Sequence, residues 1–224
     1  MPQRRGLHCL GATDVRTPYH ILCVLLVSVF VAACDIPPPG GMSPAEPSEA
    51  PTGEPTPADP APGAQEEFQL PFECGERWRL DTWAHAPALD MVREPDQTGT
   101  EGAVLVAPAA GVVNESFTHA NAGNVIQIDH GDGEFTTYLH LQSRAVEVGT
   151  EVAQGDEIGR VGRTGPTAND HPHLHLEFAI DANGDGRASW GTAGSERVTP
   201  TFDGVEYGQR NGETSRDVTS NNTC

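Results

Sequence analysis

The sequence contains no lysine: all 13 basic side chains are arginine, against 32 aspartates and glutamates, and the net charge is −19. Because phosphate contacts require clustered basic residues, this balance argues against a nucleic-acid-binding protein. The lack of lysine also excludes a carrier function in which a prosthetic group is attached to a lysine side chain. Long hydrophobic runs are lacking as well. The apolar run Ile21–Ala33 is shorter than a membrane-spanning helix, which needs about 20 residues.

The N-terminal region has the layout of a secretory signal peptide. Three arginines precede the apolar run, and small residues close it. The closing residues, Val31–Cys34, resemble a bacterial lipobox, which implies removal of residues 1–33 and attachment of lipid to Cys34. An uncleaved anchor or a plain signal peptide is the alternative. With the lipid, the protein is expected in the cell envelope, anchored to a membrane and facing the periplasm or the exterior.

Residues 34–67 are rich in proline, alanine and glycine, carry acidic side chains, and contain no basic or aromatic residue. Such a segment cannot bury enough apolar area to offset the entropy lost on ordering. We therefore expect a disordered linker, followed by one folded domain over residues 68–224 with its core at about 74–180.

Cysteine is scarce in this domain. Cys9 and Cys23 would leave with the signal peptide and Cys34 would be acylated, so only Cys74 and Cys224 remain. An even pair in an oxidising compartment favours a disulfide over two free thiols.

Helix signals are weak after residue 68, because no apolar period of 3.6 residues persists and glycine and proline recur. Strand signals are frequent, and His130–Gly133 is a turn between two of them. The expected strands lie at 103–107, 111–113, 124–129, 134–141, within 146–161, and at 173–180. The pattern predicts a mainly antiparallel β domain with few or no helices.

The last of these strands alternates histidine and acid with apolar residues. In an extended chain the side-chain period is two, so His173, His175 and Glu177 share one face. The opposite face, with two leucines and a phenylalanine, is suited to a core. Imidazoles on the open face can hold a metal or move protons near neutral pH. An incidental histidine-rich strand that binds metals loosely is the alternative.

Five blocks in chain order resemble the M23 metallopeptidases, the lysostaphin and LytM type of cell-wall endopeptidase. The blocks are HAPALD (85–90), VAPAAGVV (106–113), NVIQIDHGDGEFTTYLHL (124–141), VEVGTEVAQGDEIGRVGRTG (146–165) and HLHLEF (173–178). The resemblance implies an antiparallel β-sheet with a groove, of the barrel-sandwich hybrid type.

Transferred position by position, the resemblance implies zinc ligands at His85, Asp90 and His175, and proton-handling histidines at His140 and His173. Two neutral imidazoles and one carboxylate leave Zn²⁺ with net positive charge and an open position, as in catalytic zinc sites. The ring of His173 is expected to take a proton from water. That of His140 is expected to donate to the oxyanion that forms on the scissile carbonyl.

The sequence departs from the family pattern in two places. Four residues instead of three separate His85 from Asp90, which makes Asp81 an alternative carboxylate ligand. An insertion, Thr167–Pro172, precedes the histidine strand, so His171 is an additional candidate for the site.

The other histidines and aromatics have less definite expectations. The hairpin position of His130 predicts a structural role, and His119 is expected at the surface. Trp190 and Tyr207 could pack on the domain or line the groove.

The segment Asp181–Gly186 resembles the first half of a calcium loop, Asp-x-Asn-x-Asp-Gly. Thr192 stands where such a loop has its glutamate. A polar turn that forms without metal is therefore the alternative to a Ca²⁺ site at Asp181–Asp185.

The function implied by the resemblance is zinc-dependent hydrolysis of peptide bonds in peptidoglycan cross-links or stem peptides. The alternative is an inactive relative that regulates or activates other cell-wall hydrolases. The block at 146–162 also looks like half of a biotinyl or lipoyl carrier domain, but the missing lysine excludes that function.

Overall fold

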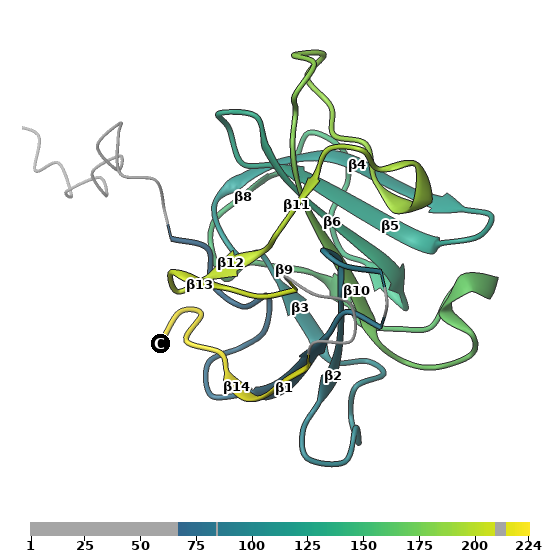
Figure 1. The fold of residues 1–224 in the computed structure, drawn as a ribbon, viewed down its shortest axis with the longest axis vertical. Helices are drawn as coiled ribbons and strands as arrows, with labels where there is room; N and C mark the ends of the chain where they lie inside the picture. Colours follow the sequence, from purple (N-terminus) through teal and green to yellow (C-terminus); the bar gives the residue numbers. More distant parts are fainter. Residues whose placement is uncertain (1–66, 84, 209–213) are drawn as a thin grey trace, which may run out of the picture. The chain divides into compact units, whose positions relative to one another are not determined.

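A large antiparallel sheet dominates the computed structural model, which describes residues 67–83, 85–208 and 214–224 (Figure 1). In spatial order its strands are β14 (Thr214–Thr219), β1 (Arg77–Asp81), β2 (Leu89–Arg93), β10 (Leu174–Ile180), β6 (Glu134–Leu141), β5 (Gly123–Asp129), β4 (Gly111–His119) and β8 (Glu151–Val152); β11 (Arg197–Val198) also pairs with β10. Every pair in this sheet is antiparallel.

The remaining elements are short. A second sheet has the order β3 (Val104–Val106), β9 (Glu157–Arg160) and β7 (Ser143–Arg144), and β12 (Thr201–Phe202) pairs with β13 (Val205–Glu206). The two helical turns are 3-10 helices, η1 (Pro166–Ala168) and η2 (Gly191–Ala193). The described part of the chain has no α-helix. The expected mainly antiparallel β fold is therefore confirmed.

Strand β10 has the alternation expected from its sequence. Leu174 and Leu176 are fully buried, whereas the intervening His175 side chain retains 13% of its exposure. Strands β2 and β6 flank β10, and His175 lies opposite both Asp90 and Leu139. The strand therefore presents its apolar face to the core and its histidine face to the groove.

The core lies between the large and the small sheet. Leu105 of β3 and Ile158 of β9 belong to the same buried cluster as Tyr138 and Leu176 of the large sheet. The rings of Phe72 and Trp78 stack in this cluster with their centroids 3.5 Å apart. Packing of this kind makes the large sheet a rigid support for side chains on its other face.

The two ends of the domain are joined. Cys74 and Cys224 form a disulfide, with their Cα atoms 5.3 Å apart, so this prediction is confirmed. The amide of Asn222 donates to the carbonyls of Leu70 and Ala107, each at 3.0 Å. These bonds hold the end of the chain against the segments before β1 and after β3.

The predicted signal peptide, the lipid site at Cys34 and nearly all of the linker lie outside the described residues. In the described part of the chain, no helix has the length and apolar character needed to cross a membrane.

Candidate metal centre

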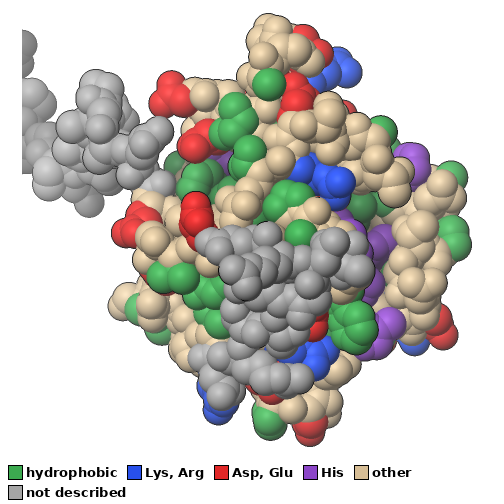
Figure 2. Space-filling view, in the orientation of Figure 1, with side chains coloured by type: hydrophobic (Ala, Val, Ile, Leu, Met, Phe, Trp, Pro, Cys, Tyr) green, Lys and Arg blue, Asp and Glu red, His purple; other side chains and the backbone are tan. Residues whose placement is uncertain are grey.

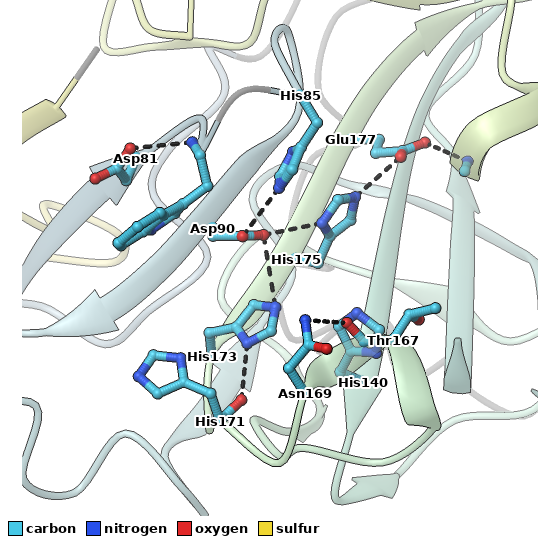
Figure 3. Close-up of polar contacts among 12 residues, drawn as sticks. Asp81, His85, Asp90, His140, Thr167, Asn169, His171, His173, His175 and Glu177 are labelled. Atoms are coloured by element: carbon cyan, nitrogen blue, oxygen red, sulfur yellow. Dashed lines mark hydrogen bonds and ion pairs between the residues drawn. The ribbon is translucent and has the colours of Figure 1, made fainter. Parts of the chain in front are cut away.

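Imidazole and carboxylate groups from three segments converge on the open face of the large sheet (Figure 3). Strand β2 supplies Asp90, β10 supplies His175, and the loop before β2 supplies His85. One carboxylate oxygen of Asp90 lies 2.9 Å from His175 Nδ1, and the other lies 3.1 Å from His85 Nε2. One ligand atom from each of the three residues lies within 4.8 Å of the others.

The longer spacing between His85 and Asp90 is accommodated by a turn. The backbone N–H of Ala88 donates to the carbonyl of His85 at 3.2 Å, and the strand then begins at Leu89. The alternative carboxylate, Asp81, instead accepts a hydrogen bond from the backbone N–H of Trp83 (Figure 3). The structure thus brings Asp90, and not Asp81, between the imidazoles.

The donor set fits a zinc ion. Bond lengths of 2.0–2.2 Å at tetrahedral angles place ligand atoms about 3.3 Å apart, close to both contacts made by Asp90. The remaining nitrogen of His85, Nδ1, is buried and has no hydrogen-bond partner among the described residues. A second group, His140, His173 and His175, also meets within 4.8 Å, so His175 is common to both groups.

The second nitrogen of His175 contacts Glu177, whose side chain is 1% exposed. Burial alone would lower the pKa of His175, but the hydrogen bonds to Asp90 and Glu177 raise it to about 9. Burial would raise the pKa of Asp90, yet its bonds from His175 and His85 hold that pKa well below the usual range. Glu177 thus orients the ring of a candidate ligand, as carboxylates do behind metal-bound histidines.

The rings of His140, in β6, and of His173, directly before β10, face the same space (Figure 3). Each ring has its Nδ1 against a carbonyl oxygen, that of Thr164 at 3.0 Å and that of His171 at 2.8 Å. Because a carbonyl only accepts, Nδ1 carries the proton in both rings and Nε2 is left with a lone pair. His140 also has a φ of 65°, a strained conformation that is concentrated at functional sites.

Lowered pKa values keep both of these rings neutral at pH 7. Burial and the neighbouring His173 and His175 lower the pKa of His140 to about 4, and burial also lowers the pKa of His173. A neutral His140 has no proton on Nε2, so the oxyanion-donor role expected from the sequence requires that this ring first take up a proton.

The structure separates the other histidines. The ring of His171 stacks on His173, with centroids 5.8 Å apart, but bonds to Gln97 and belongs to neither metal group. The two nitrogens of His130 contact the Ala110 carbonyl and the Thr136 hydroxyl, in keeping with a structural role. His119, expected at the surface, is half-buried and lines the open groove.

The site lies in an open groove of about 1050 Å³. In Figure 2, histidine side chains gather in a hollow of the surface, with arginine side chains above and below them. Trp190 lines the groove, donates to Glu115 at 3.0 Å, and packs edge-on against His119. Tyr207, in contrast, packs on the core beside Phe202.

The calcium prediction receives no support. The carboxylate of Asp181 accepts backbone N–H groups of Gly184 at 2.7 Å and of Gly186 at 2.8 Å, and these bonds hold its pKa below the usual range. The loop is therefore closed by its own hydrogen bonds, and no metal-binding group among the described residues includes it.

Two side chains of the groove were not assigned a role from the sequence. Glu177 stood on the correct face of the predicted strand, but periodicity does not reveal which ring a carboxylate contacts. Arg79 also lines the groove, and its position alternates with buried Trp78 and Leu80 along β1. Only that alternation could have indicated that it faces the site.

The fold and site together define an antiparallel β-sheet protein with a candidate His–Asp–His metal centre in an open groove. Residues 95–187 match the sequence model of peptidase family M23. The match includes His140, His173 and His175 but begins after Asp90. The other two candidate ligands, His85 and Asp90, therefore lie outside the matched region.

Similarity to individual proteins is partial. The chain is 39% identical over 89 residues to the peptidoglycan DD-endopeptidase ShyC of Vibrio cholerae, covering 40% of this chain and 20% of that protein. It is 32% identical over 123 residues to ShyA of the same organism, covering 52% and 28%. Among solved structures, a zinc-containing peptidase from Vibrio cholerae is 26% identical with a TM-score of 0.43, covering 52% of this chain and 37% of that one.

Proposed function

We propose that this protein is a zinc-dependent endopeptidase that hydrolyses peptide bonds in peptidoglycan cross-links or stem peptides. The observation that carries the proposal is the convergence of His85, Asp90, His140, His173 and His175 in one groove. The M23 match and the peptidoglycan endopeptidases among the relatives support the choice of reaction and substrate.

In this proposal His85, Asp90 and His175 hold the ion. Zinc in such a site supplies a Lewis acid that activates water and polarises a carbonyl group. Glu177 accepts the Nε2 proton of His175 and so keeps Nδ1 of that ring directed at the ion. These side chains determine where the reacting carbonyl must lie.

His173 takes the proton from water. Its Nε2 lies 3.6 Å from Asp90 Oδ1, at the edge of the ligand set, and its Nδ1–H is held by the carbonyl of His171. The ring is therefore oriented with its basic nitrogen toward the position where water would react.

His140 is the second proton carrier. Its Nε2 faces the same space, and its ring centroid lies 5.0 Å from that of His173. The proton that His173 takes from water can pass to Nε2 of this ring, which then donates to the developing oxyanion and delivers the same proton to the leaving amine.

We also propose that residues 1–33 direct export and that lipid on Cys34 anchors the protein in the envelope. The segment that follows would then be a linker that lets the peptidase domain over residues 68–224 reach the wall. Detection of lipid on Cys34 by mass spectrometry of the protein from membranes would test this arrangement.

The alternative function is a regulator that lacks activity. It differs from the enzyme in its metal content and turnover, because a regulator on this scaffold does not require zinc. Both quantities can be measured on the same purified protein.

The test compares His173→Ala with His175→Ala in the zinc-loaded protein. We expect His173→Ala to retain zinc but lose about 10²- to 10⁴-fold in cleavage rate, since a general base contributes that much. We expect His175→Ala to lose both zinc and activity. Zinc is measured by elemental analysis, and cleavage by mass analysis of digested wall material.

Asp81→Asn is the matched control for Asp90→Asn, because both remove one carboxylate from the same pair of strands. Only the Asp90 variant should lose zinc. Turnover that survives exhaustive chelation contradicts the proposal. Equal, near-zero zinc in wild type and His175→Ala favours the regulator.

A further inference from the structure

Arg79 lies beside the candidate metal centre, on the same face of the sheet. In the β1–β2 pair, Arg79 lies opposite Val92 and Asp81 lies opposite Asp90. Arg79 is thus a diagonal neighbour of Asp90, at a Cα separation of about 7–8 Å. Both residues line the groove.

The guanidinium of Arg79 has no partner among the described residues. The residue is half-buried, and its Nε atom is buried without a hydrogen bond. Four other arginines of the domain form ion pairs: Arg93 with Glu76, Arg160 with Glu157, Arg163 with Glu101, and Arg197 with Glu177. A partly desolvated cation without a counter-ion is unfavourable, so a groove that retains one is suited to an anionic ligand.

The charges of the groove support this interpretation. Four charged side chains other than histidines line it. Asp90 contacts His85 and His175, and Glu177 contacts His175 and Arg197, so three of the four are neutralised within the described part of the protein. None of the described side chains neutralises the positive charge of Arg79.

The sheet register determines which end this is. Because His175 lies opposite Asp90 in the antiparallel β10–β2 pair, His173 lies beside Val92. Val92 therefore separates His173 from Arg79. Arg79 thus stands on the side of the proposed proton acceptor, away from Arg197 and Glu177.

We propose that Arg79 forms a subsite for a carboxylate of the peptide substrate. A guanidinium binds a carboxylate with two parallel N–H···O bonds, which gives both affinity and orientation. An extended residue spans about 3.3 Å, so the separation of Arg79 from Asp90 corresponds to about two residues. The preferred substrate is then an acidic peptide with a free carboxylate about two residues from the bond that is cut.

This inference rests on the proposed function, and it is tested by binding as well as by cleavage. The zinc-loaded His173→Ala protein serves as the parent, so that ligands are not consumed. Soluble peptidoglycan fragments are titrated calorimetrically in native form and after conversion of their carboxylates to amides. The variants added to the parent are Arg79→Gln, Arg79→Lys and, as matched control, Arg187→Gln. Arg187 is exposed and does not line the groove, and its side chain has no ion-pair partner among the described residues.

We expect Arg79→Gln to weaken binding of native fragments about 10- to 100-fold, as for a lost charge-assisted hydrogen-bonded pair. Amidated fragments should bind the parent and Arg79→Gln alike, and Arg187→Gln should change neither affinity. If Arg79→Gln does not fold, Arg79→Lys gives the test, since loss of the planar fork should weaken native binding at least about threefold and leave amidated binding unchanged. Synthetic stem peptides amidated at either the terminal or the side-chain carboxylate identify which group is bound.

Two results would overturn the inference alone. One is native binding by Arg79→Gln within twofold of the parent, while the zinc-loaded wild type cleaves the fragments. The other is an equal loss for native and amidated fragments, which would mean that Arg79 only shapes the groove. A zinc-loaded wild type that neither binds nor cleaves any fragment overturns the proposed function, and this inference with it.

Discussion

At the scale of single residues, His175 links the chemistry of the site to pH. Its ring lies between two carboxylates, those of Asp90 and Glu177, at 2.9 and 3.0 Å. These contacts raise the pKa of the metal-free ring from 6.5 to about 9. At pH 7 the ring is therefore protonated before metal enters, whereas a metal ligand must be neutral.

We expect zinc binding at pH 7 to release about one proton from His175. Because the group must lose a proton that it holds below about pH 9, zinc affinity should rise about tenfold per pH unit from pH 7 and level off near pH 9. Calorimetric titration in two buffers of different ionisation enthalpy measures the release. His173→Ala, which keeps the contacts of His175, is the control. Zinc uptake at pH 7 without proton release would contradict the assigned ligand.

The sequence located most of these residues but not their contacts. The alternation around His173 and His175 indicated a shared face correctly, and the block at 85–90 indicated a second segment of the site. The contact between Glu177 and His175, and the carbonyls that set the tautomers of His140 and His173, depend on side-chain torsions and on residues brought in by other loops. No spacing rule contains that information.

At the scale of elements, β10 couples the core to the site. Its buried leucines lie under the groove, and its histidines form the groove floor. A cavity left under this strand should therefore lower stability, because the surrounding structure relaxes only in part.

We expect Leu176→Ala to lower the free energy of unfolding by about 2–5 kcal/mol, since Leu176 is fully buried. Ile180→Ala is the matched control, because Ile180 belongs to the same face of β10 but is 37% exposed. It should cost no more than about 1.5 kcal/mol. Urea unfolding of the metal-free protein measures both values, so that zinc linkage does not enter. Equal losses of stability in the two variants would mean that the burial of Leu176 under the groove does not stabilise the strand.

The strands themselves were predictable because an exposed groove on one face and a core on the other impose a period of two. Their partners were not. Val104–Val106 forms a small sheet with β9 and β7 instead of joining the large sheet, since its pairing depends on where the 146–161 segment folds back. Local pattern specifies the face that a strand buries, but long-range packing chooses its neighbour.

At the scale of the whole molecule, the chain closes on itself through its last residues. The disulfide joins residues 150 positions apart. Ser220 and Asn222 bond to the carbonyls of Phe72 and Leu70, so that the segment after β14 is held against the segment that precedes β1.

We expect replacement of both Cys74 and Cys224 by serine to lower the melting temperature. The free energy of unfolding should fall by up to about 5 kcal/mol, because the bridge no longer restricts a long loop in the unfolded state. Zinc content at 25 °C should stay the same, because no ligand belongs to this segment and the Asn222 bonds remain. Thermal unfolding of wild type with and without reductant, beside the double variant, measures the change. An unaltered melting temperature would show that the hydrogen bonds alone close the domain.

The sequence by itself determined the β class, the pairing of the two remaining cysteines, and the histidine face of one strand, because each depends on local periodicity or on counting. Tertiary structure alone decided that Asp90 and not Asp81 meets the imidazoles, that Glu177 holds His175, and that Arg79 has no counter-ion in the described domain. The physical reason is that charge pairing and ring orientation depend on ångström-scale distances between segments, and those distances are set only when the two sheets pack.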